Sequence, residues 1–246
     1  MSKVIVITGA GEGLGRALAR RFAADGHRLV LLGRTLAKIE KAATEIGAHA
    51  TALACDVGAP DSVRAAFAAI GAKHQQIDVL INNAGIYAPY TIAEATDAQI
   101  LGSIATNFTG VVLCTRAAIP LLPRGGQILN ISSESSIWEQ FPMNAMYQAT
   151  KAGLERFSLA MVHELAPAGI RVTAVRAGAM YDEDKRGLGI DPDLQRRWGE
   201  ACVAVGLDFR KRPISHYRNV ADAFARLLDL PPDVQTDFVS LHARAK

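Results

Sequence analysis

The first fifteen residues of the chain restrict its fold more than any other segment. Residues 4–7 form an apolar, β-branched run that is typical of a buried strand, and glycines follow at Gly9, Gly11, Gly13 and Gly15. A strand that leads through a glycine-rich turn into a helix lets backbone N–H groups approach a pyrophosphate, whose charge the positive helix end favours. The segment therefore predicts a dinucleotide site in an α/β fold.

Short β-branched runs alternate with helix-sized intervals along the chain. We expect seven strands, at residues 4–8, 29–32, 50–55, 79–81, 127–131, 171–175 and 237–241. Strands that alternate with helices form a parallel sheet covered on both faces. We therefore predict a doubly wound, three-layered Rossmann-type fold with the strand order 3-2-1-4-5-6-7. At 246 residues, half of them hydrophobic, the chain is expected to form a single dinucleotide-binding domain over residues 1–246.

One stretch, from about residue 180 to residue 213, lacks a clear periodicity. It is rich in charge and glycine, and it follows the sixth predicted strand. Ligands of such sheets bind beyond the carboxyl ends of the strands. We therefore expect this stretch to form a flap over the substrate, with a poorly packed surface insertion as the alternative.

Charge and composition argue against several kinds of partner. The net charge is only +3 and the basic residues are scattered, so we expect neither nucleic acid nor a membrane surface as a partner. The longest apolar stretch, residues 111–122, is too short to span a bilayer. The chain begins without the pattern of a signal peptide, which predicts a cytoplasmic location. Its histidines and cysteines are dispersed, so no catalytic metal is expected.

Tyr147 and Lys151 stand four residues apart and would share one face of a helix. A tyrosine has an ordinary pKa near ~10, which is too high for an efficient base at neutral pH. One positive charge about 4 Å away, at an effective dielectric near 20, is worth roughly 4 kcal/mol or about three pKa units. We therefore expect Lys151 to lower the pKa of Tyr147 and to make it a general acid/base.

Five motifs occur in one order along the chain. They are Thr8-Gly9-x-x-x-Gly13-x-Gly15, Asn82-Asn83-Ala84-Gly85, Asn107, the pair Ser132-Ser133, and Tyr147-x-x-x-Lys151. In this order and spacing the chain resembles the short-chain dehydrogenase/reductase family in its classical form. The resemblance implies a nicotinamide cofactor, hydride exchange with a carbonyl compound or secondary alcohol, and assembly into a homodimer or homotetramer. It also implies that Lys151 holds the ribose hydroxyls.

By the same resemblance, Ser133 binds the substrate oxygen and steadies the developing alkoxide. In relatives this serine usually stands thirteen positions before the tyrosine, whereas here Ser133 stands fourteen positions before Tyr147 and Glu134 stands thirteen positions before it. We take the intervening loop to contain one extra residue. Ser132, Ser135 and Ser136 are the alternatives, and a carboxylate at the serine site would oppose the forming phenolate by like-charge repulsion.

The resemblance assigns roles to further residues. Asn107 helps to hold a water that continues the proton path from Tyr147 and Lys151 to solvent. The residues expected to bind the cofactor are Gly9, Gly11, Glu12, Gly13, Leu14, Gly15, Arg34, Thr35, Asp56, Val57, Asn83, Ala84, Gly85, Tyr147, Lys151 and Gly178. Where relatives have Pro-Gly and a threonine that contacts the carboxamide, this chain has Ala177-Gly178-Ala179-Met180, which leaves the cofactor contact on that side in question.

The end of the second predicted strand bears on the choice of cofactor. Sites that prefer NAD place a carboxylate there, because it accepts hydrogen bonds from the ribose 2′-hydroxyl. This chain has Arg34, which suits bidentate contact with a 2′-phosphate, and Thr35, which offers another hydrogen bond. Glu12 argues the other way, because its position is often basic in relatives that use NADP. The balance favours NADP over NAD.

These observations predict an oxidoreductase that transfers hydride between NADP(H) and a small, apolar carbonyl compound or secondary alcohol. Aromatic residues such as Tyr87, Trp138 and Phe141 flank the expected active face and suggest the apolar substrate. The alternative is a cofactor-binding sensor or scaffold with weak catalysis, which the shifted Ser133 and the altered segment at Gly178 would explain.

Overall fold

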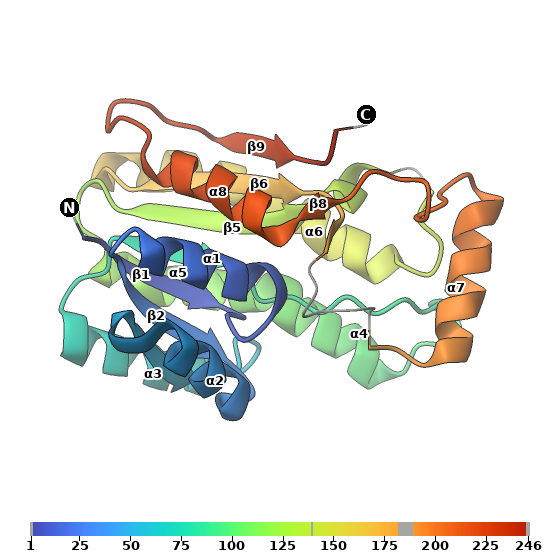
Figure 1. Ribbon diagram of the computed structural model, residues 1–246, viewed down its shortest axis with the longest axis horizontal. Coiled ribbons are helices and arrows are strands. Elements are labelled where there is room, and N and C mark those ends of the chain that lie inside the picture. Colours follow the sequence, from blue (N-terminus) through green and yellow to red (C-terminus); the bar gives the residue numbers. More distant parts are fainter. Residues whose placement is uncertain (1, 139, 182–188, 245–246) are drawn as a thin grey trace.

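The structure is a computed structural model that describes residues 2–138, 140–181 and 189–244 (Figure 1). This part of the chain forms a seven-stranded parallel sheet with the order β3-β2-β1-β4-β5-β6-β9. β1 (Val4–Thr8) pairs with β2 (Arg28–Gly33) on one side and with β4 (Val79–Asn82) on the other. The remaining strands of the sheet are β3 (Ala50–Ala54), β5 (Gln127–Ser133), β6 (Arg171–Ala177) and β9 (Phe238–Leu241).

Both faces of the sheet are covered by helices, which produces the predicted three layers (Figure 1). One face carries α1 (Gly13–Ala24), α2 (Leu36–Ile46) and α8 (Tyr217–Leu228). The other face carries α3 (Pro60–His74), α5 (Gly110–Ala118) and α6 (Ala145–Leu165). α4 (Asp97–Ile104) runs into α5 through a π-helical turn, Ala105–Thr109. Short 3₁₀ turns lie at Gly47–His49, Ile119–Leu121, Glu134–Ile137 and Ala166–Ala168.

The apolar run in β1 is buried on both sides. Ile5 and Ile7 pack with Phe22 of α1 in the core of one face, whereas Val4 and Val6 belong to the core of the opposite face. None of these four apolar side chains is more than 3% exposed. A continuous apolar strand in place of an alternating one is the pattern expected when helices cover both faces of a parallel sheet.

The predicted strand order is confirmed, with β9 as the seventh strand of the sheet. The predicted ends of two strands were wrong, because β5 and β6 continue past residues 131 and 175. Ser132 pairs with Arg176 and Ser133 with Ala177, so the ladder continues through these residues. Ser133 is therefore the last residue of a strand, and the sheet fixes the position of its backbone.

The stretch from residue 180 to residue 213 contains a helix that its weak periodicity did not indicate. α7 (Pro192–Ala204) begins at Asp191, whose carboxylate accepts hydrogen bonds from the N–H groups of Asp193 and Leu194 at 3.0 and 3.1 Å. An aspartate followed by proline is a start signal for a helix, and it was the missed clue. Two short strands, β7 (Met180–Tyr181) and β8 (Ser215–His216), pair outside the main sheet. Residues 182–188 of the predicted flap lie outside the described residues.

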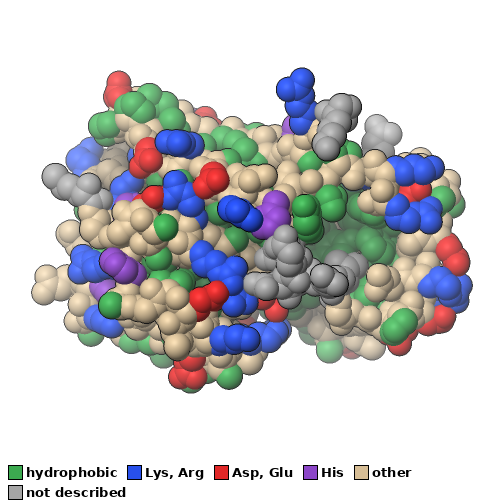
Figure 2. All heavy atoms as spheres, in the orientation of Figure 1, with side chains coloured by type: hydrophobic (Ala, Val, Ile, Leu, Met, Phe, Trp, Pro, Cys, Tyr) green, Lys and Arg blue, Asp and Glu red, His purple; other side chains and the backbone are tan. Residues whose placement is uncertain are grey.

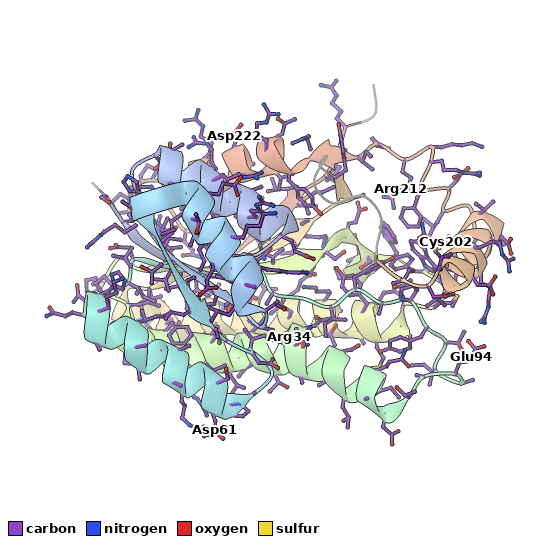
Figure 3. The ribbon with its side chains drawn as sticks, turned by 60° about the horizontal axis from the view of Figure 1, so that its bottom comes forward. Arg34, Asp61, Glu94, Cys202, Arg212 and Asp222 are labelled. Atoms are coloured by element: carbon purple, nitrogen blue, oxygen red, sulfur yellow. The ribbon has the colours of Figure 1, made fainter. Side chains whose placement is uncertain are left out.

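α7 stands apart from the sheet, beyond the carboxyl ends of the strands (Figure 1). Figure 2 shows a hollow between α7 and the body of the molecule, with hydrophobic side chains in its depth. α7 is the described part of this stretch that lies beyond the strand ends, and its role as a flap over a substrate stays a prediction. Figure 3 shows Cys202 on α7 and Arg212 on the chain that follows it.

The helical segment Asp97–Leu121 is the one segment of the described residues that is long and apolar enough to span a membrane. Its inner face belongs to the protein core, where Cys114 and Ala118 are fully buried together with Phe67 and Ile70 of α3. The segment is therefore a core helix of the domain, and it extends further toward the N-terminus than the apolar stretch 111–122.

Candidate active site

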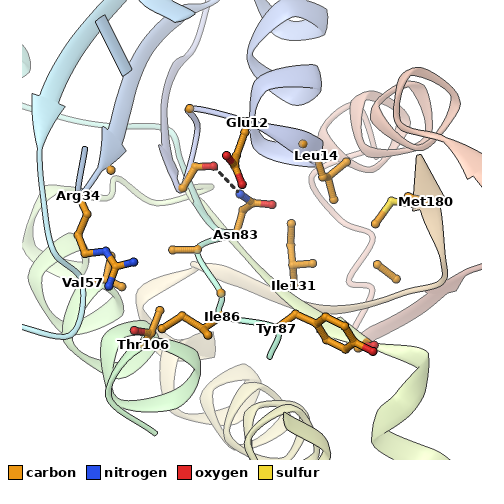
Figure 4. Close-up of a pocket in the computed structure, with 18 of the residues that line it drawn as sticks. Glu12, Leu14, Arg34, Val57, Asn83, Ile86, Tyr87, Thr106, Ile131 and Met180 are labelled. Carbon is orange, nitrogen blue, oxygen red and sulfur yellow. Dashed lines mark hydrogen bonds between the residues drawn. The ribbon is translucent and has the colours of Figure 1, made fainter. Parts of the chain in front are cut away.

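A cleft of about 370 Å³ lies at the carboxyl ends of β1, β2, β4 and β5. The chain leaves β1 toward one face of the sheet and β4 toward the other, and such a switch point is where doubly wound folds bind ligands. In the close-up of the cleft, Arg34 and Val57 lie at one end and Tyr87 and Met180 at the other (Figure 4). The elongated shape suits a dinucleotide.

Nearly all of the residues predicted to bind the cofactor line this cleft. They are Gly9, Gly11, Glu12, Gly13, Leu14, Arg34, Thr35, Asp56, Val57, Asn83, Ala84, Gly85, Tyr147, Lys151 and Gly178. Gly15 is behind the loop and packs against Gly9 and Asn83. Lining residues that sequence reasoning missed flank these motifs, and they include Gly33, Lys38, Ile39, Cys55, Ile86, Thr106, Ile131 and Tyr217.

The glycine loop has the geometry of a phosphate cradle. Gly9 and Gly13 adopt φ angles of +66° and +54°, a backbone region that disfavours residues with a Cβ. The Asn83 side chain fixes the loop in place. Its Nδ2 donates hydrogen bonds to the carbonyls of Thr8 and Gly9 at 2.9 and 3.1 Å (Figure 4). The N-terminus of α1 opens into the same place without a side-chain cap, so its N–H groups are available to an anion. These features fit the pyrophosphate of a dinucleotide.

Tyr147 lies in the first turn of α6 and faces Ser133 at the end of β5. The Ser133 hydroxyl is the side-chain group that interacts with the tyrosine hydroxyl. Burial raises the pKa of Tyr147 above its ordinary value, and the hydrogen bond with Ser133 opposes that rise in pKa. The phenol is therefore protonated at neutral pH and is poised to donate a proton.

Lys151 follows one turn later and is only 5% exposed. Its Nζ donates a hydrogen bond to the carbonyl of Ile131 at 2.8 Å and lies 5.8 Å from the centre of the Tyr147 ring. Burial lowers the pKa of Lys151 to about 8. The expectation that Lys151 lowers the pKa of Tyr147 was wrong for the protein without cofactor. The Lys151 ammonium donates its hydrogen bond to the carbonyl of Ile131, and burial of the phenol is the main influence on the pKa of Tyr147, which it raises.

Hydrogen bonds separate Ser133 from the three alternative serines. Ser132 donates to the Lys151 carbonyl at 3.1 Å and to Glu155 at 2.8 Å, and Ser136 donates to Glu155 at 2.7 Å. The Ser135 hydroxyl is buried and donates to Ser133 at 2.9 Å. Of these hydroxyls, only that of Ser133 has a described contact with the phenol. This geometry supports Ser133 as the active-site serine.

Glu155 fixes the loop around Ser133 from behind. It lies on α6 one turn after Lys151, and its carboxylate accepts two hydrogen bonds from Arg176 of β6 at 3.0 and 2.7 Å. The same carboxylate accepts the hydroxyls of Ser132 and Ser136, which flank the turn that carries Ser133. These contacts lower the pKa of Glu155 against an opposing effect of burial, so it stays ionised.

Glu134 is one residue past the serine site. Its carboxylate forms an ion pair with Arg212, with Oε1 3.1 Å from Nη2. The geometry therefore keeps the Glu134 carboxylate engaged with Arg212, and the hydroxyl that contacts Tyr147 belongs to Ser133.

Asn107 is fully buried in the π-helical turn between α4 and α5. Its side chain accepts a hydrogen bond from the N–H of Ile86 at 2.7 Å and donates one to the carbonyl of the same residue at 2.9 Å. A Cβ added at Gly85 would lie 3.5 Å from Asn107 Oδ1 and 3.6 Å from Lys151 Nζ, so both side chains approach the same glycine. A π-helical turn is frequent at functional sites, and no sequence signal indicated it.

Arg34 and Thr35 follow β2 at the far end of the cleft and are exposed. Within the described residues, no carboxylate forms an ion pair with Arg34. Glu12 is paired with Lys38, with 3.0 Å between Oε2 and Nζ. The negative charge of Glu12 is therefore balanced by Lys38, which the sequence pattern did not indicate. Asp56 lines the same end and caps the turn at Gly58.

An aromatic cluster forms the opposite end of the site. Tyr87 packs edge-on against Tyr147 at 4.9 Å between ring centres, and it stacks with Phe141 at 6.3 Å. Trp198 of α7 packs against Tyr87 at 5.9 Å, which brings α7 close to Tyr147. The aromatic flank was predicted, but the contribution of α7 was not.

The altered segment at Gly178 is held by the edge of the sheet. The N–H of Gly178 donates to the carbonyl of Leu241 in β9 at 2.7 Å. A Cβ at Gly178 would lie 3.0 Å from backbone and side-chain atoms of His242 and 3.3 Å from Glu134 Oε2. The glycine thus permits a close approach of three segments beside the cleft.

Comparison with known proteins agrees with this geometry. The family described as short chain dehydrogenase matches residues 3–186. Serine 3-dehydrogenase from Agrobacterium fabrum is 35% identical over 187 residues, which cover 74% of this chain and 74% of that protein. Sulfoacetaldehyde reductase from Chromohalobacter salexigens is 33% identical over 240 residues, which cover 95% of this chain and 91% of that protein.

Solved structures give the same result. The 3-ketoacyl-(acyl-carrier-protein) reductase from Brucella melitensis, complexed with NADH, has a TM-score of 0.80 at 29% identity, covering 97% of this chain and 96% of that chain. The closed form of serine dehydrogenase, complexed with NADP+, has a TM-score of 0.82 at 25% identity, covering 99% and 96%. The chain therefore belongs to the short-chain dehydrogenase/reductase family of NAD(P)-dependent oxidoreductases, which act on CH–OH and C=O groups.

Proposed function

We propose that this protein transfers hydride between NADP(H) and a small carbonyl compound or secondary alcohol, with Tyr147 as the general acid/base. The observation that carries the proposal is the meeting of Tyr147, Ser133 and Lys151 at one end of a cleft that begins at a glycine loop. The nicotinamide cofactor supplies the hydride donor or acceptor when it is bound.

The residues of the site divide the remaining work. The Tyr147 hydroxyl gives its proton to the carbonyl oxygen during reduction and receives it back during oxidation. The Ser133 hydroxyl donates a hydrogen bond to the same oxygen, where negative charge develops. Lys151 holds the ribose hydroxyls and stabilises the phenolate that reduction leaves behind. Asn107 supports the path by which Tyr147 recovers a proton.

A fluorescence titration with NADPH and NADH, followed by a panel of carbonyl compounds and alcohols, tests this function. Two relatives are named for charged compounds, serine and sulfoacetaldehyde, so the panel includes charged as well as apolar substrates. We expect tight binding of a reduced cofactor and its oxidation by at least one class of carbonyl compound. Tight binding of cofactor without any turnover would instead support the sensor or scaffold.

Replacing Arg34 with Gln is expected to weaken NADPH binding by roughly 10- to 100-fold, because a hydrogen bond to a charged group is worth about 1.5–3 kcal/mol. Binding of NADH should change little, since it lacks the 2′-phosphate. Arg28→Gln is the matched control, because Arg28 is exposed at the opposite end of the same strand. Isothermal titration with both cofactors measures the effect, and equal losses for NADPH and NADH would contradict NADP preference.

We also propose that the protein is a cytoplasmic homodimer or homotetramer. Leu101 and Ile104 on α4 are 65% and 37% exposed, which leaves apolar surface beside the helices that relatives commonly use for assembly. Sedimentation at micromolar concentration is expected to give a multiple of 26.2 kDa. A single species of 26.2 kDa would contradict assembly.

A further inference from the structure

Glu134 and Arg212 place two opposite charges beside Ser133 and the aromatic cluster, next to residues that line the cleft but not among them. Glu134 follows Ser133 directly, and its Oε2 lies 3.3 Å from the Cβ position of Gly178, which lines the cleft. Arg212 stacks on Trp138, with 4.2 Å from the guanidinium carbon to the ring centre. Trp138 belongs to the aromatic cluster that also contacts Tyr147.

The ion pair is largely shielded from solvent, since the side chains of Arg212 and Glu134 are only 27% and 16% exposed. Shielded charges lose hydration, and each of their polar atoms then needs a partner. The pair satisfies one atom on each side, Nη2 of Arg212 and Oε1 of Glu134.

One polar atom on each partner remains available. Nη1 of Arg212 is buried and has no hydrogen-bond partner among the described residues. The structure also gives no hydrogen bond to Oε2 of Glu134 within the described part of the chain. The Arg212 guanidinium lies over the Trp138 ring, and a guanidinium whose N–H groups lack partners suits a carboxylate.

We propose that Glu134 and Arg212 bind the two charged groups of a β-hydroxy-α-amino acid, with the carboxylate on Arg212 Nη1 and the ammonium on Glu134 Oε2. A ligand with both charges keeps the pair neutral as a whole, whereas an anion or a cation alone leaves one charge uncompensated. Glu134 directly follows Ser133 in the chain, which places the proposed head-group site next to the serine that would hold the reacting hydroxyl.

This inference rests on the proposed hydride transfer and names its substrate class. In the oxidation, the C–H bond beside the hydroxyl breaks with its electron pair going to NADP+. The hydroxyl proton goes to Tyr147 in its phenolate form, which must first have lost its own proton to solvent, and the product is the corresponding β-carbonyl amino acid. The aromatic rings then shield the Glu134–Arg212 pair. The substrate proposed here is charged, whereas the aromatic residues that flank the site suggest an apolar one.

The test compares NADP+-dependent oxidation of serine, 3-hydroxypropanoate, which lacks the ammonium, and ethanolamine, which lacks the carboxylate. Each enantiomer of serine is used. We expect the preferred enantiomer to have a kcat/KM at least roughly tenfold above that of either analogue, since hydrogen bonds to charged groups are strong. Ethane-1,2-diol as the preferred substrate would overturn the proposal.

Two variants then separate the roles of the two charges. Glu134→Gln is expected to raise KM roughly 10- to 100-fold for serine and to lower that for 3-hydroxypropanoate, because no uncompensated carboxylate remains. Arg212→Gln is expected to raise KM for serine and 3-hydroxypropanoate and to lower that for ethanolamine, because no uncompensated guanidinium remains. Arg210→Gln is the control, because Arg210 lies on the same segment with an 80% exposed side chain. Equal effects of either variant on all three compounds would overturn the assignment.

A binding measurement keeps this inference separable from the proposed function. Alanine has the same charged head group without the hydroxyl, so it should quench the fluorescence of Trp138, which stacks on Arg212, in the presence of NADP+. If no alcohol is oxidised but alanine binds and both variants abolish its binding, the head-group site stands and the proposed reaction fails. Alanine binding that is unchanged in both variants overturns the head-group site.

Discussion

Replacing Tyr147 with Phe is expected to lower kcat for carbonyl reduction by roughly 10²- to 10⁴-fold, the range for loss of a general acid. The substitution removes only the hydroxyl, so the edge-on packing of the ring against Tyr87 is retained. NADPH binding should therefore persist while turnover is lost. Stopped-flow fluorescence separates the two, because it reports binding of the reduced cofactor and its oxidation in the same experiment.

The pH profile of the natural enzyme gives a second readout for the role of Tyr147. Burial raises the pKa of Tyr147, so the phenol keeps its proton at neutral pH and can donate it. Burial lowers the pKa of Lys151 to about 8, so its ammonium loses the proton as pH rises through that value. The positive charge that stabilises the phenolate is then lost, and carbonyl reduction by the natural enzyme should fall above about pH 8.

Tyr90→Phe provides the matched control. Tyr90 is 7% exposed, and its hydroxyl hydrogen-bonds to Ser103 at 2.9 Å, outside the set of residues that line the cleft. This variant is expected to keep the natural kcat and the fall above pH 8. Undiminished turnover by Tyr147→Phe would refute the role of Tyr147 as general acid/base.

The sheet was predictable because its signals are local. Each strand is a short β-branched run, and the rules for right-handed connections leave few orders for parallel strands. The carboxyl ends of β5 and β6 could not be placed, because Ser132 and Ser133 read as a turn and extend the strand only through pairing with Arg176 and Ala177. The sequence of α7 shows little helical periodicity, because the helix buries only Trp198 and Cys202.

The candidate site was predictable where its residues belong to one motif. The glycine loop and the Tyr147–Lys151 helix face each follow from a few consecutive residues, and the structure brings both to one cleft. Contacts between distant segments could not be foreseen. The Glu134–Arg212 pair joins residues 78 positions apart, and the Glu12–Lys38 pair joins the loop to α2.

Replacing Gly15 with Ala is expected to destabilise the protein by roughly 3 kcal/mol, the upper part of the range for overpacking in a tight interior. The added Cβ would lie 2.4 Å from the carbonyl oxygen of Gly9 and 2.5 Å from Nδ2 of Asn83. Neither contact is relieved by a flexible side-chain end, because Gly9 offers backbone and Asn83 is held by its hydrogen bonds to Thr8 and Gly9. For a chain of this size the change corresponds to a fall of about 6–12 °C in Tm.

The added Cβ should push the Gly9 carbonyl and the Asn83 side chain out of place. Cofactor binding should then weaken, because the carbonyls that Asn83 fixes belong to the loop predicted to cradle the pyrophosphate. Gly102→Ala is the control, since a Cβ at this position in α4 meets no atom within 4 Å and alanine favours a helix by up to about 1 kcal/mol. Thermal unfolding with and without NADPH measures both effects. If Gly15→Ala unfolds at the natural temperature and keeps its full shift with NADPH, the close packing of α1 on this loop is not needed for either property.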